Sequence, residues 1–196
     1  MYPKIYNLIT LALLVGTAGC LSQPQPADRN SAPAAIQANA HPDISVRNNA
    51  LALLQNLLGD EQDVAKVLIL KSASDPTRRL LKDISATAKQ YHTEIEAIAR
   101  QLPDYDVKNL DLPSGEVAAR KAESKTTEHA ILHSHGADFE FEILLSQAQA
   151  LDYGSHLAGL IAINETNSTR AGQFSALAQE LNALYERTAL LMKTKN

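Results

Sequence analysis

Apolar residues recur every three or four positions through most of the chain after residue 47, and this periodicity constrains the fold more than any other feature. Two stripes are especially regular: Leu81, Ile84, Ala88, Tyr91, Ile95, Ile98 and Leu102, and then Phe174, Leu177, Leu181, Leu184, Thr188 and Leu191. This spacing places side chains on one face of an α-helix, whereas a half-buried strand would show alternation. Aromatic residues make up only 5% of the chain and Trp is absent, which also favours helices over a β-sandwich. The pattern predicts an all-α fold.

Proline and glycine positions suggest where the helices begin and end. The first helix is expected from about Asn48 to Leu68, with Gly59 as a weak point inside it. Asp75 followed by Pro76 predicts a second helix with Asp75 as its N-cap, ending before Pro103. No proline occurs from Ser114 onward, and this predicts helices over 114–134 and 138–164, a break at His135-Gly136, and a last helix capped by Ser168 or Thr169. Four main helices with short connections predict an antiparallel four-helix bundle.

The first nineteen residues have the layout of a secretory signal. Lys4 precedes an apolar run of 11 residues from Leu8 to Ala18, which ends in small residues. A membrane-spanning helix needs roughly 20 apolar residues, so this run is too short for a permanent span.

Cys20 follows Thr17-Ala18-Gly19 and is the sole cysteine of the chain. This arrangement resembles the signal of bacterial lipoproteins, in which a lipid is attached to the cysteine thiol and the cysteine becomes the new N-terminus. The resemblance implies removal of residues 1–19 and a membrane anchor on Cys20. Leu21 and Ser22 stand where enterobacterial members retained in the inner membrane carry Asp, which implies the outer membrane, facing the periplasm. The alternative is an ordinary secretory signal cleaved near Ala18, which leaves a free thiol.

Residues 20–46 are rich in Pro, Ala and Gln, and four of the eight prolines of the chain lie there. Such a segment has little apolar surface to bury and stays extended, with an average span of about 25–30 Å. The sequence therefore predicts a tether over 20–46 that holds a folded domain, residues 47–196, away from the membrane surface.

Three helical pairs could contribute to a metal site. His129 and His133 are four residues apart, and the helix stripe that contains them carries no charge, so both are expected to point into the bundle. A His-x3-His pair on a helix can grip zinc, copper or nickel, and two pairs meeting in a bundle would complete the coordination shell. The other pairs are His92 with Glu96 and Asp152 with His156. The alternative is that these side chains make ordinary hydrogen bonds.

No complete catalytic motif accompanies these pairs. Asp138, Glu140 and Glu142 alternate with phenylalanines, which predicts a solvated helix start stabilised by the helix dipole rather than paired catalytic carboxylates. The sequence has no Gly-rich phosphate loop and no Gly-x-Ser-x-Gly elbow. A net charge of −4 argues against nucleic acid as a partner, because a nucleic-acid binder needs a basic face.

The order of the helices, together with Leu132, Gly136 and Phe139-Glu140, resembles the ferritin-like four-helix family of predicted exported bacterial proteins of unknown function. The resemblance spans roughly Ala50 to Met192 and implies a ferritin-like bundle. The Glu-x-x-His pairs of true ferritins do not occur in the chain, so di-iron oxidase chemistry is disfavoured.

Two functions follow from these observations. The favoured hypothesis is a lipid-anchored, non-enzymatic envelope protein that binds a protein partner through its helix faces or serves as an adaptor or structural module. The alternative is a periplasmic protein that binds a divalent transition metal through His129 and His133, with the other pairs completing the shell.

Overall fold

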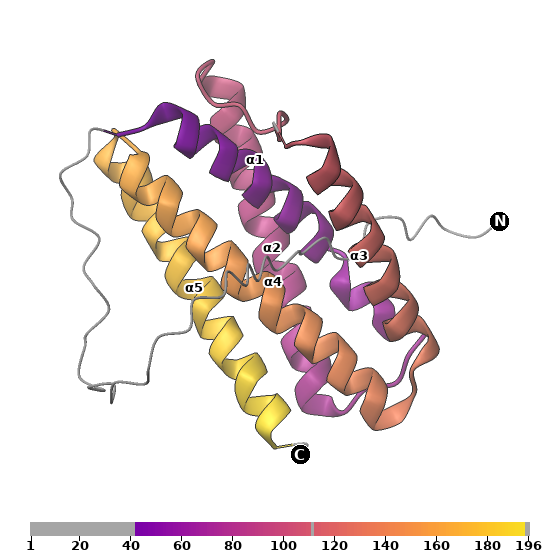
Figure 1. The fold of residues 1–196 in the computed structure, drawn as a ribbon. Coiled ribbons are helices and arrows are strands. Elements are labelled where there is room, and N and C mark those ends of the chain that lie inside the picture. The colour runs from indigo at the N-terminus through magenta and orange to yellow at the C-terminus, as the bar shows by residue number, and fades with distance from the viewer. Residues whose placement is uncertain (1–41, 111, 195–196) are drawn as a thin grey trace, which may run out of the picture.

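The computed structural model describes residues 42–110 and 112–194, and within these ranges the chain is helical, with no strand (Figure 1). The prediction of an all-α fold is confirmed. The elements are α1 (Ile44–Glu61), the short 3-10 helix η1 (Val64–Ile69), α2 (Asp75–Gln101), α3 (Ser114–His133), α4 (Gly136–Asn164) and α5 (Ser168–Lys193). None of the helices in the described ranges is both long enough and apolar enough to cross a membrane.

Helix α4 packs against both α1 and α5. The backbone N–H of Asp43, just before α1, donates to Oδ1 of Asn164 at the end of α4 (2.9 Å), so α1 and α4 run in opposite directions. Gly154 marks the close approach of the three helices. A Cβ atom there would lie 2.9 Å from Leu57 of α1 and 3.2 Å from Leu181 of α5. The missing side chain at Gly154 therefore lets α4 pack closely on both neighbours.

Helix α2 packs against the other side of α1 and α5. Toward α1, Nε2 of Gln55 donates to the carbonyl oxygen of His92 at 3.1 Å. Toward α5, Nη2 of Arg187 lies 2.6 Å from Oδ2 of Asp83, and Oγ1 of Thr87 donates to Glu180 at 2.9 Å. From Asp83 to Thr87 the chain runs up α2, while their partners run down α5 from Arg187 to Glu180, so these two helices are also antiparallel.

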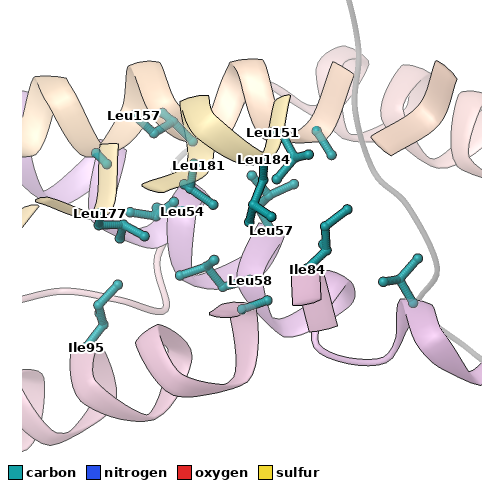
Figure 2. Packing of buried hydrophobic residues seen from close by; sticks show 14 of the residues in the cluster. Leu54, Leu57, Leu58, Ile84, Ile95, Leu151, Leu157, Leu177, Leu181 and Leu184 are labelled. Atoms are coloured by element: carbon teal, nitrogen blue, oxygen red, sulfur yellow. The ribbon is translucent and has the colours of Figure 1, made fainter. Parts of the chain in front are cut away.

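Leucine and isoleucine side chains from α1, α2, α4 and α5 fill the space between these helices (Figure 2). The apolar stripes predicted for α2 and α5 form part of this core: Leu81, Ile84, Ala88 and Ile95 are buried, as are Phe174, Leu177, Leu181, Leu184 and Thr188. Helix α3 contributes far less, because Ile131 is its one buried residue. Most of the core therefore comes from α1, α2, α4 and α5, with Val64 and Val67 of η1 added to it, and α3 packs against α4.

The first helix begins earlier and ends earlier than the sequence predicts. Oδ1 of Asp43 accepts hydrogen bonds from the backbone N–H groups of Ser45 (2.8 Å) and Val46 (3.2 Å), which makes Asp43 the N-cap of α1. Residues 44–46, expected in the tether, thus form the first turn of the domain. Helix α1 ends at Glu61, and the residues expected at its C-terminal end belong to η1 instead.

The other boundaries lie within two residues of the predicted ones. A break between α3 and α4 is confirmed: Ser134 and His135 are non-helical, and α4 begins at Gly136, whose φ of 57° is a left-handed conformation that favours glycine. Ser74 rather than Asp75 is the N-cap residue of α2, and Pro76 lies in the first turn. Asn167, not Ser168, caps α5 by accepting a hydrogen bond from the N–H of Arg170 (3.0 Å).

Candidate functional site

His129 and His133 lie side by side on α3, but both are exposed to solvent. Their rings are stacked, with centroids 3.8 Å apart and planes inclined by 16°, and Nδ1 of His133 lies 2.8 Å from the carbonyl oxygen of His129. The lone pair of an imidazole lies in the ring plane, so two stacked rings do not direct nitrogens at one ion. The prediction that these histidines point into the bundle is wrong, because α3 turns only Ile131 toward the core.

Of the remaining predicted metal ligands, Asp152 and His156 meet only as a pair on one helix. Glu96 is exposed and lies 3.7 Å from Arg100, and exposed His156 lies 3.6 Å from Asp152 on the same helix. His92 is half-buried beside Gly59 of α1. Within the described part of the chain, no group of three or more His, Cys, Asp or Glu residues is placed to hold a metal ion. Cys20, the predicted lipidation site, lies outside the described residues.

A polar groove runs between α1, α2 and the segment that follows α2. It has a volume of about 420 Å³, and its polar lining consists of Gln55, Asn56, Asp60, Gln62, His92 and Lys108. These side chains offer hydrogen-bond donors and acceptors together with both signs of charge. The groove is open to solvent, so it suits a small polar ligand better than a reaction that needs water excluded.

The most unusual group of the domain is the carboxyl group of Glu61 at the end of α1. Glu61 is only 4% exposed, and Gln147 of α4, which faces it, is fully buried. Neither carboxyl oxygen of Glu61 and neither amide atom of Gln147 has a well-formed hydrogen bond. A buried polar pair that is so poorly satisfied costs stability, because each group has lost its hydration without a full replacement.

Burial raises the pKa of Glu61 to about 8. Loss of hydration is the largest cause, the nearby amide of Gln147 offsets part of the rise, and the negative charge of Asp60 adds to it. Glu61 is therefore a protonated, neutral acid at pH 7. Protonated, it can donate to the amide oxygen of Gln147, which the ionised form cannot do.

A buried charged group lies at the opposite end of α1. Arg47 is 1% exposed, and its Nη2 donates to the carbonyl oxygen and to Oδ2 of Asp104, each at 2.9 Å. Its Nη1 lies 4.0 Å from Oε2 of Glu165, whose side chain is fully buried. The hydrogen bond from Arg47 holds the pKa of Asp104 below its usual range. These contacts join the start of α1 to the segment after α2 and to the α4–α5 connection.

Tyr105 completes this network by lying between two guanidinium groups. The guanidinium carbon of Arg47 lies 4.3 Å from the centre of the Tyr105 ring, and that of Arg170 lies 5.5 Å from it. Arg170 also donates to the Tyr105 hydroxyl (3.0 Å) and to Oε1 of Glu165 (2.9 Å). The arrangement holds together the start of α1, the segment after α2 and the α4–α5 connection, so its role is structural.

For the acidic run at the start of α4, the prediction of a solvated helix start is correct for Asp138 and wrong for Glu140. Asp138 is exposed, as predicted for a solvated helix start, but Glu140 is buried. Oε1 of Glu140 accepts from the backbone N–H of Ser74 (2.9 Å), and Oε2 accepts from the hydroxyls of Ser74 (2.7 Å) and Thr77 (2.6 Å). Glu140 thus caps the beginning of α2 from another helix, which joins α2 and α4 at one end of the bundle.

Sequence reasoning missed Arg47, Glu61 and Gln147, although the sequence holds a signal for the first two. Arg47 and Glu61 fall three or four residues from the apolar positions Ala50, Leu51, Leu57 and Leu58, on the stripe that faces the core. A charged residue at such a position is buried with a partner or shifts its pKa. Their partners lie more than fifty residues away in the chain and could not be identified from spacing.

No protein-family model, no curated protein and no solved structure matches this chain.

Proposed function

We propose that this protein is a lipid-anchored component of the bacterial cell envelope, with a helical domain that serves as a non-enzymatic binding, adaptor or structural module. The observation that carries the proposal is Cys20, the sole cysteine, which directly follows the apolar run and Thr17-Ala18-Gly19. In this proposal the mature chain begins at Cys20. Leu21 and Ser22 favour the outer membrane, with the domain in the periplasm.

The physical chemistry of acylation suits this proposal. Each buried methylene group of an acyl chain contributes about 0.8 kcal/mol, and two or more chains make the attachment effectively permanent. Residues 20–42 would then form the tether, with a mean span of about 25–30 Å. Residue 42 lies where α1 begins and α4 ends, so the anchor would join the domain at this end.

We also propose that α1, α2, α4 and α5 form an antiparallel four-helix bundle of the ferritin-like type. Its support is the cycle of contacts α1–α2–α5–α4–α1, in which the neighbours run in opposite directions. Glu140 bonds the start of α4 to the start of α2, so these two helices run in the same direction. A ferritin-like bundle has one long crossover between its second and third core helices, and α3 would fill that crossover.

The distribution of polar groups supports a binding module over an enzyme. Arg47, Glu140 and Glu165 are bonded to segments that they hold in place, and the histidine pair of α3 lies on the surface. The surfaces that remain available to a partner are the long helix faces and the polar groove beside His92. We therefore assign the domain to recognition, with a protein partner bound through helix faces.

Cys20→Ala tests the anchor directly. We expect the wild-type protein to incorporate a fatty-acid analogue and to fractionate with membranes, and the Cys20→Ala variant to lose the label because its acylated atom is gone. The label is measured after membrane fractionation in a bacterial host, with Ser22→Ala as the matched control. Continued labelling of Cys20→Ala would contradict the proposal.

A second candidate function, metal binding, rests on the proximity of the exposed His129 and His133 rings. After a change of rotamer the two rings could grip one zinc, copper or nickel ion. A metal at one hundred times its Kd would stabilise the domain by about 2.7 kcal/mol. Since the stacked rings do not converge, we expect micromolar Zn²⁺ to leave the melting temperature unchanged. A shift that disappears in the His129→Ala/His133→Ala variant would establish metal binding instead.

A further inference from the structure

Three of the most exposed large apolar side chains of the domain lie at one end of it. Ile69 is 81% exposed, Leu190 62% and Leu70 57%. Ile69 and Leu70 form the tip of η1, which precedes α2. Leu190 lies one turn beyond Arg187, whose side chain is bonded to Asp83 near the start of α2. The ends of η1 and α5 and the start of α2 thus gather at the same end of the molecule (Figure 1).

The chain around the η1 tip is rich in basic residues. Between residues 66 and 82 the chain has five basic residues and one acid, Asp75: the basic residues are Lys66, Lys71, Arg78, Arg79 and Lys82. Lys66 pairs with Asp63, and Arg78 lies 3.9 Å from Asp75. Arg79 and Lys82 are exposed and have no acidic partner among the described residues. Lys193 in the last turn of α5 adds a further positive charge at this end, whereas the first turns of α4 add the acidic residues Asp138 and Glu142.

Hydrogen bonds connect the tip and the start of α2 to the neighbouring segments. Nζ of Lys71 donates to the carbonyl oxygen of Ser134 at 2.9 Å, which fixes the end of η1 to the α3–α4 junction. Glu140 holds the first turn of α2 through Ser74 and Thr77. The exposed Ile69 and Leu70 are therefore presented by an ordered framework. Adjacent large apolar side chains exposed on an ordered framework are a feature of protein and membrane interaction sites.

We propose that this end, the basic tip (residues 66–82 with Leu190), docks on an anionic lipid surface. Ile69 and Leu70 enter the headgroup region, while Arg79 and Lys82 engage lipid phosphates. The argument is charge complementarity: in a chain with a net charge of −4, the exposed bases Arg79 and Lys82 lie in the first turns of the helix that follows the exposed Ile69 and Leu70. Apolar side chains flanked by Lys and Arg are the combination by which a surface segment binds an anionic bilayer.

The position of the basic tip makes this contact independent of any lipid at Cys20. Residue 42 lies at the opposite end of the domain, beside Asn164. The 27 residues of α2 run from the tip toward that end, a distance of about 40 Å. A domain bound through the tip would turn its other end away from that lipid surface, so anchoring near residue 42 does not by itself bring Ile69 to a bilayer.

The absence of Trp from the sequence allows a direct test with the full chain. In the Ile69→Trp variant the single indole reports its own surroundings. We expect phosphatidylglycerol vesicles to shift its emission to shorter wavelength and phosphatidylcholine vesicles to leave it unchanged. Leu70→Trp should respond in the same way. Ile44→Trp, at the opposite end, should not respond and serves as the positional control.

Charge variants complete the test. Each basic residue near an anionic surface contributes about a fivefold change in affinity, so Arg79→Gln/Lys82→Gln in the Ile69→Trp background should raise the lipid concentration at half-maximal shift by roughly thirtyfold. Lys121→Gln/Lys125→Gln removes the same charge from α3 and should change nothing. The proposal is overturned by the absence of a shift with phosphatidylglycerol or by an equal shift with phosphatidylcholine. A shift with polyglutamate but not with vesicles overturns it too, and would indicate an acidic protein partner.

Discussion

Glu61→Gln is expected to remove most of the loss of stability that the protein shows between pH 4.5 and pH 8. The folded state raises the pKa of Glu61 from 4.5 to about 8, so in this range the folded chain holds a proton that the unfolded chain has released. The free energy of unfolding therefore falls as pH rises, by about 1.4 kcal/mol per unit for this one group. By pH 7 the loss amounts to about 3 kcal/mol. Glutamine has the same shape as the protonated acid and does not titrate.

The measurement is urea unfolding of both proteins at pH values from 4 to 9. The quantity of interest is the difference in unfolding free energy between Glu61→Gln and the wild type, since the titration of all other groups cancels in it. We expect this difference to grow in favour of the variant up to pH 8 and then level off. Glu186→Gln, on the exposed surface of α5, should give a flat difference. A flat difference for Glu61→Gln as well would contradict the burial of an unpaired carboxyl group.

Arg47→Met is expected to destabilise the domain by about 3 kcal/mol. Methionine preserves much of the aliphatic length of the side chain but removes the guanidinium group that meets Asp104, Tyr105 and Glu165. The side chain of Glu165 is fully buried, so it would retain only Arg170 to balance its charge. Removing one partner of a buried ion pair typically costs about 3–5 kcal/mol, because the remaining charge stays out of water.

Arg100→Met provides the matched control for this prediction. Arg100 is 68% exposed and forms an ion pair with Glu96, so its loss should cost less than about 1 kcal/mol. Both variants are compared with the wild type by thermal and urea unfolding at pH 7. If Arg47→Met cost no more than Arg100→Met, the network around Tyr105 would not be what holds this end of the domain together.

The parts of the fold that could be predicted from sequence are those specified by local patterns. The stripes of α2 and α5 identify their buried faces because a helix places every third or fourth residue on one side. The break before α4 can be predicted because Gly136 follows it and few residues other than glycine adopt a positive φ. The exact N-caps were harder to predict: Ser74, Asp75 and Pro76 are adjacent, and the interhelical bond to Glu140 fixes the start of α2.

Much less of the candidate site could be predicted from the sequence. The orientation of His129 and His133 was predicted from an uncharged stripe on α3, but a stripe faces the core only if the helix packs along its length. Helix α3 buries Ile131 alone, so the stripe stays in solvent. The surroundings of Glu61 are set by a partner on α4. Those of Arg47 are set by partners in the segment after α2 and in the α4–α5 connection. Such contacts between distant segments are set by packing, which spacing within one helix does not reveal.

The measurement that most directly tests lipid anchoring is the intact mass of the mature protein extracted from the membranes of a bacterial host. The proposal predicts a chain that begins at Cys20 and carries the added mass of a diacylglyceryl group on its thiol, with or without a further acyl chain on its amine. A mature chain that begins at another residue, or one in which Cys20 carries a free thiol, would contradict it.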